Sequence, residues 1–267
     1  MPSGPRILLI AERFPPDLGG LARSGARTAG ALARLEAQVD VFTWTRTLPP
    51  GGLQTLDAGE IAASARGATL HRLGLFGQTD TSLQHTLDVL DFLHARRHYQ
   101  LVWGHYLSPP GFMAVTFAGL AGIPSTVSAR GNDVDQAMFP PGDFARLLWT
   151  LQRATVLTAA SGDLARKMVL LLGKDPGVEV IPNAVDTSLF TPGPADSALR
   201  QRLGIQPEEL VLGFSGELRH KKGTPFLFSA LSEVRKVRPA CLLVIGEVRA
   251  RDLELLSSFR AEHPEDA

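Results

Sequence analysis

The chain has 267 residues, of which 44% are hydrophobic and 20% are charged. This balance provides for a packed core and excludes a disordered protein, and the length predicts one complete domain and part of a second. Lysine plus arginine and aspartate plus glutamate both total 27, which excludes the strong basic field of a nucleic-acid-binding protein, so any anion site must be a local patch.

Cysteine usage and hydropathy indicate a cytoplasmic protein. Cys241 is the single cysteine, so no internal disulfide can form and a reducing compartment is expected. The apolar run 7–11 is shorter than the core of a signal peptide, and no apolar run reaches the length that spans a membrane. The weakly polar segment 111–122 predicts a buried helix, and peripheral contact with the inner face of a membrane stays open as an alternative.

Short apolar runs alternate with helical patterns through most of the chain. The expected strands are residues 6–11, 39–44, 68–73, 101–105, 125–128, 155–160 and 178–181, and the expected helices are 21–38, 82–97, 111–121, 143–154 and 162–172. The polar, glycine-rich stretch 49–67 gives no readable pattern. Because repeated β-α units need crossover connections, the sequence predicts an α/β domain of Rossmann-like type, with a parallel sheet covered by helices on both faces.

A connector rich in turn residues follows the last of these strands. The residues that make it unsuited to a helix or a strand are Pro182, Asn183, Pro192, Gly193 and Pro194. It indicates a boundary between two units. The predicted organisation is an N-terminal domain over residues 1–186, a linker over 187–208 and a partial C-terminal domain over 209–267.

The strand and helix pattern restarts after this connector. Strands are expected at residues 210–214 and 241–245, and helices at 224–237 and 251–260. A doubly wound sheet ordinarily has more strands than two. We therefore expect the second sheet to be incomplete in this chain.

Two glycines lie between the first strand and the first helix. Ligands of open α/β sheets bind at this carboxyl edge, Gly19 and Gly20 allow close approach of the backbone, and a helix N-terminus offers free N–H groups to an anion. A plain strand-to-helix turn is the alternative. The loop lacks the Gly-x-Gly-x-x-Gly pattern and the chain has no P-loop motif, which disfavours an oxidoreductase and P-loop chemistry.

Polar residues follow two further strands at the same edge. His105 ends one strand, and Arg130, Asn132 and Asp133 follow the next, where they bring a cation, an amide and a carboxylate together. These groups suit a polyhydroxylated substrate. The alternatives are a structural histidine and a capped turn in which Asn132 or Asp133 starts a helix. Ser161 is predicted to cap the helix that follows it.

A basic turn opens the second unit. Residues 213–223 read Gly-Phe-Ser-Gly-Glu-Leu-Arg-His-Lys-Lys-Gly, between the end of a strand and the start of a helix. Such a turn is a local anion site that fits a diphosphate, with Arg219 or Lys222 as the counter-charge. A solvated basic turn is the alternative.

Five stretches in this order carry a family resemblance. They are the Pro-Pro-x-x-Gly-Gly loop at 15–20, Gly-His-Tyr at 104–106, Arg-Gly-Asn-Asp-Val at 130–134, Ile-Pro-Asn-Ala-Val-Asp at 181–186 with Phe190, and Gly-x-Leu at 216–218 leading to Lys222 and Gly223. Together they resemble family four of the retaining, nucleotide-sugar-dependent glycosyltransferases. The resemblance implies the GT-B fold of two Rossmann-like domains.

The resemblance also implies roles for the residues at the sheet edge. The enzyme would move a sugar from a nucleotide-diphosphate sugar to a carbohydrate, lipid or small-molecule acceptor, with retention and without a cofactor or an obligatory metal. His105 would contact the donor sugar near the reacting centre. The donor diphosphate would be bound by Gly19, Gly20, Arg219 and Lys222. The acceptor would be contacted by Arg130, Asn132 and Asp133.

Two departures from the family pattern bear on activity. Glu217 stands where the family usually has an arginine, and Arg219 is the nearest substitute. The family's glutamate pair, which binds the donor in the second half of the second domain, has no counterpart here. We therefore expect this chain to be a fragment whose activity belongs to the complete protein. A sugar-nucleotide epimerase and a non-catalytic binding or partner protein are the alternatives.

Overall fold

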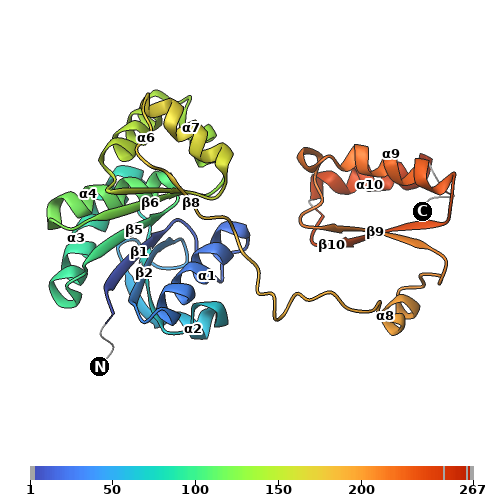
Figure 1. Cartoon of the computed structure of the whole chain (residues 1–267), viewed down its shortest axis with the longest axis horizontal. Helices are drawn as coiled ribbons and strands as arrows, with labels where there is room; N and C mark the ends of the chain where they lie inside the picture. The colour runs from blue at the N-terminus through green and yellow to red at the C-terminus, as the bar shows by residue number, and fades with distance from the viewer. Residues whose placement is uncertain (1–3, 249, 263, 265–267) are drawn as a thin grey trace. The chain divides into compact units, whose positions relative to one another are not determined.

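The computed structural model describes residues 4–248, 250–262 and 264. The chain divides into two compact units, Met1–Val185 and Asp186–Ala267, and each is described by itself (Figure 1). Within the described residues, no helix combines the length and the apolar character needed to cross a membrane.

The first unit is built on an eight-stranded sheet. Its strands are β1 (Arg6–Ala11), β2 (Gln38–Thr45), β3 (Leu53–Asp57), β4 (Ala68–Gly74), β5 (Leu101–His105), β6 (Ser125–Ala129), β7 (Val156–Ala159) and β8 (Glu179–Val180). The order across the sheet is β3-β4-β2-β1-β5-β6-β7-β8, and the neighbouring pairs are parallel apart from β3 with β4.

Helices cover both faces of this sheet (Figure 1). They are α1 (Gly20–Arg34), α2 (Ala58–Ile61), α3 (Thr79–Arg97), α4 (Phe112–Ala121), α5 (Asp133–Ala137), α6 (Pro141–Arg153) and α7 (Gly162–Leu172), with short turns η1 (Ala63–Ala65) and η2 (Leu107–Gly111) between them. The predicted Rossmann-like arrangement is confirmed by this layering.

Strand β1 shows why both faces must be covered. Leu9 packs with Ala26 and Ala29 of α1 on one face, and Leu8 packs with Leu90 of α3 on the other. All five of these side chains have 0% exposure. Alternate residues of a strand point to opposite faces, so a continuous apolar run such as that of β1 requires a helix layer on each side.

The stretch 49–67 differs from expectation because it contains β3, α2 and η1. β3 pairs antiparallel with β4, so the sheet is mixed and the prediction of a parallel sheet is wrong at this edge. The side chains of β3 alternate between exposed and half-buried. An edge strand with so little buried surface carries a weak hydrophobic pattern, which explains why its sequence was unreadable.

Asp40 of β2 is the centre of a buried polar cluster in the first unit. Its carboxylate, 1% exposed, accepts hydrogen bonds from Arg97 Nε at 2.7 Å, Arg97 Nη2 at 2.6 Å and Tyr99 Oη at 2.7 Å. His71 Nε2 lies 3.4 Å from the same carboxylate. Burial, the largest single influence, raises the pKa of Asp40, but the hydrogen bonds from Arg97 and Tyr99, together with the nearby His71 imidazole, outweigh it and hold this pKa well below its usual range. The cluster ties the end of α3 to the sheet.

The second unit is a small β-α-β arrangement. It contains α8 (Ser197–Arg202), β9 (Leu210–Ser215), the turn η3 (His220–Lys222), α9 (Thr224–Arg235), β10 (Ala240–Ile245) and α10 (Ala250–Glu262). β9 and β10 are parallel. Helix α8 lies inside the predicted linker 187–208, where no helix was expected. Asp196 caps it, because its side chain accepts a hydrogen bond from the Leu199 N–H at 2.9 Å.

Candidate functional site

Four strand ends bring the candidate residues of the first unit to one edge. In the sheet register Ala11 of β1 lies beside His105 of β5, His105 lies beside Ser128 of β6, and Ala129 lies beside Ala159 of β7. The loops that follow these strands are therefore neighbours. They carry the glycine pair, the Gly-His-Tyr stretch and the Arg-Gly-Asn-Asp stretch, as the sequence predicts.

His105 is buried behind this edge, with 1% of its surface exposed. Its Nε2 lies 3.2 Å from Ser24 Oγ. Burial, followed by the positive charge of Arg130, lowers the pKa of His105 to about 3 against a smaller opposing effect of its own backbone. The imidazole is therefore neutral near pH 7, and it can exchange hydrogen bonds there but cannot act as a cation.

Ser24 of α1 is a site residue that sequence reasoning missed. Its Oγ accepts a hydrogen bond from Arg130 Nη2 at 2.7 Å, in addition to the contact with His105. The same Arg130 nitrogen also donates to Asn183 Oδ1 in the connector. The sequence feature that could have indicated Ser24 as a site residue is its position four residues after Gly20, about one helical turn from the start of α1.

Asp133 is buried and organises the loops around it. Its carboxylate accepts hydrogen bonds from the backbone N–H groups of Leu107 at 3.1 Å, Arg130 at 3.1 Å and Gly131 at 3.0 Å. Burial, the largest influence, nevertheless raises the pKa of Asp133 above its usual value. The carboxylate of Asp133 is thus already bound by the backbone of two loops of its own chain.

Asn132 and Tyr106 link the same two loops on the exposed side. Tyr106 Oη donates to Asn132 Oδ1 at 2.9 Å, and Tyr106 itself holds φ at 122°, in the region that favours glycine. Helix α5 begins at Asp133, as the capped-turn alternative expected, but the Asn132 side chain makes no capping hydrogen bond.

The turn before α4 depends on two glycines. A Cβ on Gly104 would lie 2.5 Å from Gly111 Cα, and a Cβ on Gly111 would lie 2.6 Å from Val127 Cγ1 and 2.9 Å from the Tyr106 carbonyl oxygen. These separations are shorter than a carbon atom tolerates. Only glycine at both positions lets the turn pack this closely on the strands that carry His105.

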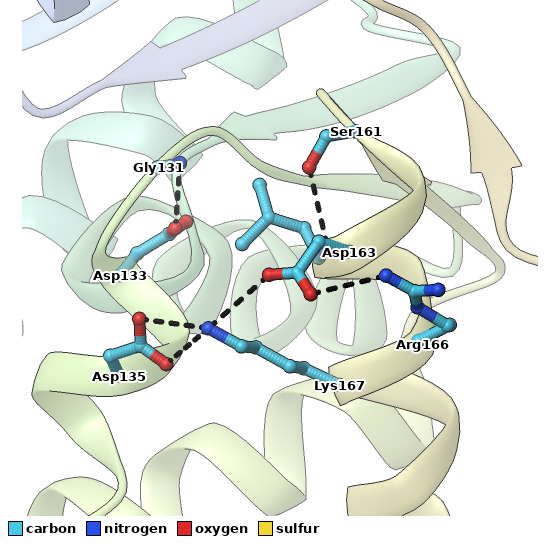
Figure 2. A network of polar contacts seen from close by, with 8 residues as sticks. Gly131, Asp133, Asp135, Ser161, Asp163, Arg166 and Lys167 are labelled. Carbon is cyan, nitrogen blue, oxygen red and sulfur yellow. Dashed lines mark hydrogen bonds and ion pairs between the residues drawn. The ribbon is translucent and has the colours of Figure 1, made fainter.

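A surface network supports α5 from the side of α7 (Figure 2). Lys167 Nζ lies 2.8 Å from Asp135 Oδ1 and 3.4 Å from Asp163 Oδ2, so it joins the two helices. Ser161 Oγ accepts a hydrogen bond from the Leu164 N–H at 3.3 Å, which confirms the predicted cap. Exposed ion pairs of this kind contribute little stability, so the network adds a contact between α5 and α7 without stabilising the fold strongly.

A cavity of about 240 Å³ opens beside these loops. The residues that line it are Thr79, Leu83, Tyr106, Ser108, Pro109, Phe112, Asp133, Gln136, Ala137, Asp143 and Arg146. The guanidinium of Arg146 is already paired, with Asp80 at 3.3 Å and Asp143 at 3.6 Å. The lining combines aromatic surface with carboxylates, a combination that suits a small polyhydroxylated molecule.

The start of α1 is open. Gly19 precedes the helix with φ at 122°, a conformation that favours glycine, and no side chain caps the helix. A Cβ at Gly19 or Gly20 would meet no atom within 4 Å. The first turn carries no acidic residue. Its free N–H groups and the helix dipole therefore remain available to an anion.

Arg219 of the basic turn in the second unit is paired. Arg219 Nη1 lies 3.2 Å from Glu217 Oε2, so the carboxylate that replaces the family's arginine is neutralised by its neighbour. Lys222 is exposed and forms no ion pair with a described residue. Among the described residues, no group of three histidine, cysteine, aspartate or glutamate side chains could hold a metal ion.

Comparison with known proteins assigns the family. Residues 19–184 match the family model described as "Glycosyl transferase 4-like domain". This match covers more than half of the chain, so the chain belongs to the glycosyl transferase 4-like family. The predicted family and its GT-B fold class are confirmed.

Two curated proteins and one solved structure are similar to the chain. The "D-inositol 3-phosphate glycosyltransferase" of Kineococcus radiotolerans is 29% identical over 86% of this chain and 55% of its own length. The "GDP-mannose-dependent alpha-(1-6)-phosphatidylinositol monomannoside mannosyltransferase" of Mycobacterium tuberculosis is 29% identical over 90% of this chain and 60% of its own length. The crystal structure of Anabaena Alr3699/HepE in complex with UDP-glucose has a TM-score of 0.69 at 17% identity, over 96% of this chain and 65% of that one. The chain thus spans less than two thirds of each of these three proteins.

Proposed function

We propose that this chain provides the acceptor-side domain and the beginning of the donor-side domain of a retaining glycosyltransferase. The enzyme moves a hexose from a nucleotide-diphosphate sugar to a hydroxyl group of an acceptor. The observation that carries this proposal is the open start of α1 beside buried His105, at the sheet edge where ligands of α/β folds bind. The names of the similar proteins, which include GDP-mannose and UDP-glucose, support a donor of this class.

The donor diphosphate is bound by two groups in this proposal. The N–H groups that follow Gly19 and Gly20 supply one of them. Lys222 supplies the other, because the charge of Arg219 is already shared with Glu217. Lys222 would stabilise the negative charge that grows on the leaving diphosphate as the glycosidic bond breaks. A lysine in this role makes an obligatory metal unnecessary.

The acceptor is a polyhydroxylated carbohydrate or inositol derivative in this proposal. The names of two relatives contain inositol, and the cavity lined by Tyr106 and Asp133 offers hydrogen-bonding groups beside the edge. Asn132 lies next to this cavity through its bond with Tyr106. Arg130 remains a candidate for the acceptor, although its Nη2 atom is already committed to Ser24 and Asn183. A lipid-linked acceptor would bring the cytoplasmic enzyme to the inner face of the membrane.

The test uses the whole protein with UDP- and GDP-hexoses and with inositol, inositol phosphate and simple glycosides as acceptors. We expect a glycoside by mass spectrometry, with the anomeric configuration of the donor retained in its NMR spectrum. An isomerised sugar nucleotide formed without any acceptor would instead identify an epimerase. Donor binding with neither product would identify a binding protein.

A further inference from the structure

The hydrogen bonds around Ser24 join three segments that are distant in the sequence. We propose that Ser24 and Arg130 are positioning residues, which hold the His105 imidazole and connect it to the inter-unit connector through Asn183. The inference rests on the proposed function for its catalytic meaning, but the connection itself is a property of the first unit. It makes the orientation of His105 depend on the conformation of the connector.

The first step is the contact between the serine and the imidazole. A guanidinium only donates hydrogen bonds, so Ser24 Oγ accepts from Arg130 Nη2 at 2.7 Å. The hydroxyl keeps its own proton and a second lone pair for His105 Nε2 at 3.2 Å. Within the described part of the chain no other partner of this hydroxyl is found. Ser24 therefore fixes the direction of the Nε2 atom in an otherwise buried ring.

The second step is the bridge to the connector. Arg130 Nη2 carries two hydrogen atoms, one for Ser24 and one for Asn183 Oδ1. The connector residues 181–185 are exposed, so few other contacts determine their conformation. Arg27 of α1 makes a second attachment, because its Nη1 donates to the Ala184 carbonyl at 3.2 Å. The two attachments are separate, and only the loss of the Asn183 contact changes the hydrogen bonding of the Arg130 nitrogen that also binds Ser24.

The burial of Arg130 indicates that this arrangement has a cost. Burial lowers the pKa of Arg130, and the charge of Asp133 only partly opposes this effect. The Nε atom of Arg130 is buried without a hydrogen-bond partner among the described residues. A half-satisfied guanidinium destabilises a fold and calls for an explanation. Holding the connector and the histidine at fixed positions supplies one.

The test compares four variants of the full chain. Ser24→Ala and Asn183→Ala break the connection at its two ends, Ser24→Thr keeps the hydroxyl, and Arg27→Ala removes the other connector contact without touching Ser24. The probe is the ring nitrogen spectrum of histidine in 15N-labelled protein, in which the His105 signal is identified by its loss in His105→Gln. Thermal melting shows that each variant is folded.

We expect Ser24→Ala and Asn183→Ala to shift the His105 nitrogen signals, and Ser24→Thr and Arg27→Ala to leave them in place. An unchanged His105 signal in Asn183→Ala would overturn the proposal, and so would equal shifts in Asn183→Ala and Arg27→Ala. In the whole enzyme, Ser24→Ala should lower kcat about tenfold with little change in KM, and Ser24→Thr should restore it. Because the spectrum needs no turnover, failure of the transferase proposal leaves the spectroscopic test intact.

Discussion

The replacement Asp40→Asn tests how the buried cluster stabilises the first unit. The substitution is isosteric, so it leaves no cavity and changes only the charge and one acceptor atom. The carboxylate accepts three short hydrogen bonds, two from Arg97 and one from Tyr99. An amide nitrogen at either oxygen position would face at least one of these donors.

The structure sets the size of the expected effect. One lost hydrogen bond to a charged group costs about 1.5–3 kcal/mol, and a buried ion pair that loses one partner costs about 3–5 kcal/mol. The Arg97 side chain is 46% exposed and can recover some solvation, which favours the lower end of this range. We expect the free energy of unfolding to fall by about 3 kcal/mol.

The measurement is urea unfolding followed by tryptophan fluorescence at pH 7. The control is Asp91→Ala on the exposed face of helix α3, the helix that carries Arg97, and it should change stability by less than about 0.5 kcal/mol. Because the folded-state pKa of Asp40 is depressed, its contribution is present above the unfolded pKa near 3.8 and is lost as the pH falls below it. A loss under about 1 kcal/mol at pH 7 would refute this account of the cluster.

The remaining predictions concern the whole enzyme. Lys222→Ala should lower kcat about 100-fold, as removal of one group that stabilises a developing oxyanion does. Arg219→Ala should lower kcat less, because Glu217 already pairs with that arginine. Equal losses in the two variants would contradict the assignment of Lys222, rather than Arg219, as the counter-charge of the diphosphate. His105→Ala should lower kcat strongly in steady-state assays, and near-normal turnover would exclude a role at the reacting centre. The His105 pKa of about 3 lies below that of a free histidine. Its neutral form therefore stabilises the fold above about pH 6.5, and this contribution declines as the pH falls through the folded pKa. The profile of kcat between pH 5 and 8 should show no step that disappears in His105→Gln. Transfer should continue at an unchanged rate in excess EDTA, and its abolition with recovery on added magnesium would show that Lys222 does not replace a metal.

The sequence predicted secondary structure best where apolar residues form continuous runs or recur with the period of a helix. Strands β1 and β5 and helices α1 and α3 were predictable because buried strands need continuous apolar runs and helices need periodic ones. Strand β3 was not, since a half-exposed edge strand has no such run. Helix α8 was missed because its six residues include none that is buried.

The sequence predicted that the candidate residues lie at one edge of the sheet, but not how they contact one another. Gly19, His105 and Arg130 were placed there because the carboxyl ends of parallel strands meet. Their partners were not predictable, since hydrogen bonds between residues 24, 105, 130 and 183 depend on distances that no local pattern records. The pairing of Arg219 with Glu217 was likewise a matter of side-chain geometry. The assignments of these residues to donor or acceptor remain predictions.

The close contact between Gly104 and Gly111 is a site at which a single substitution should make the protein temperature-sensitive. A methyl group at either position would collide with backbone or with Val127 at distances that a rotamer change cannot relieve. The strain would fall on the turn that presents Tyr106, at a point that itself carries no reacting group. Gly111→Ala is therefore a rational starting point for a temperature-sensitive allele. In such an allele the active-site groups are intact at low temperature, and the strained turn unfolds on warming.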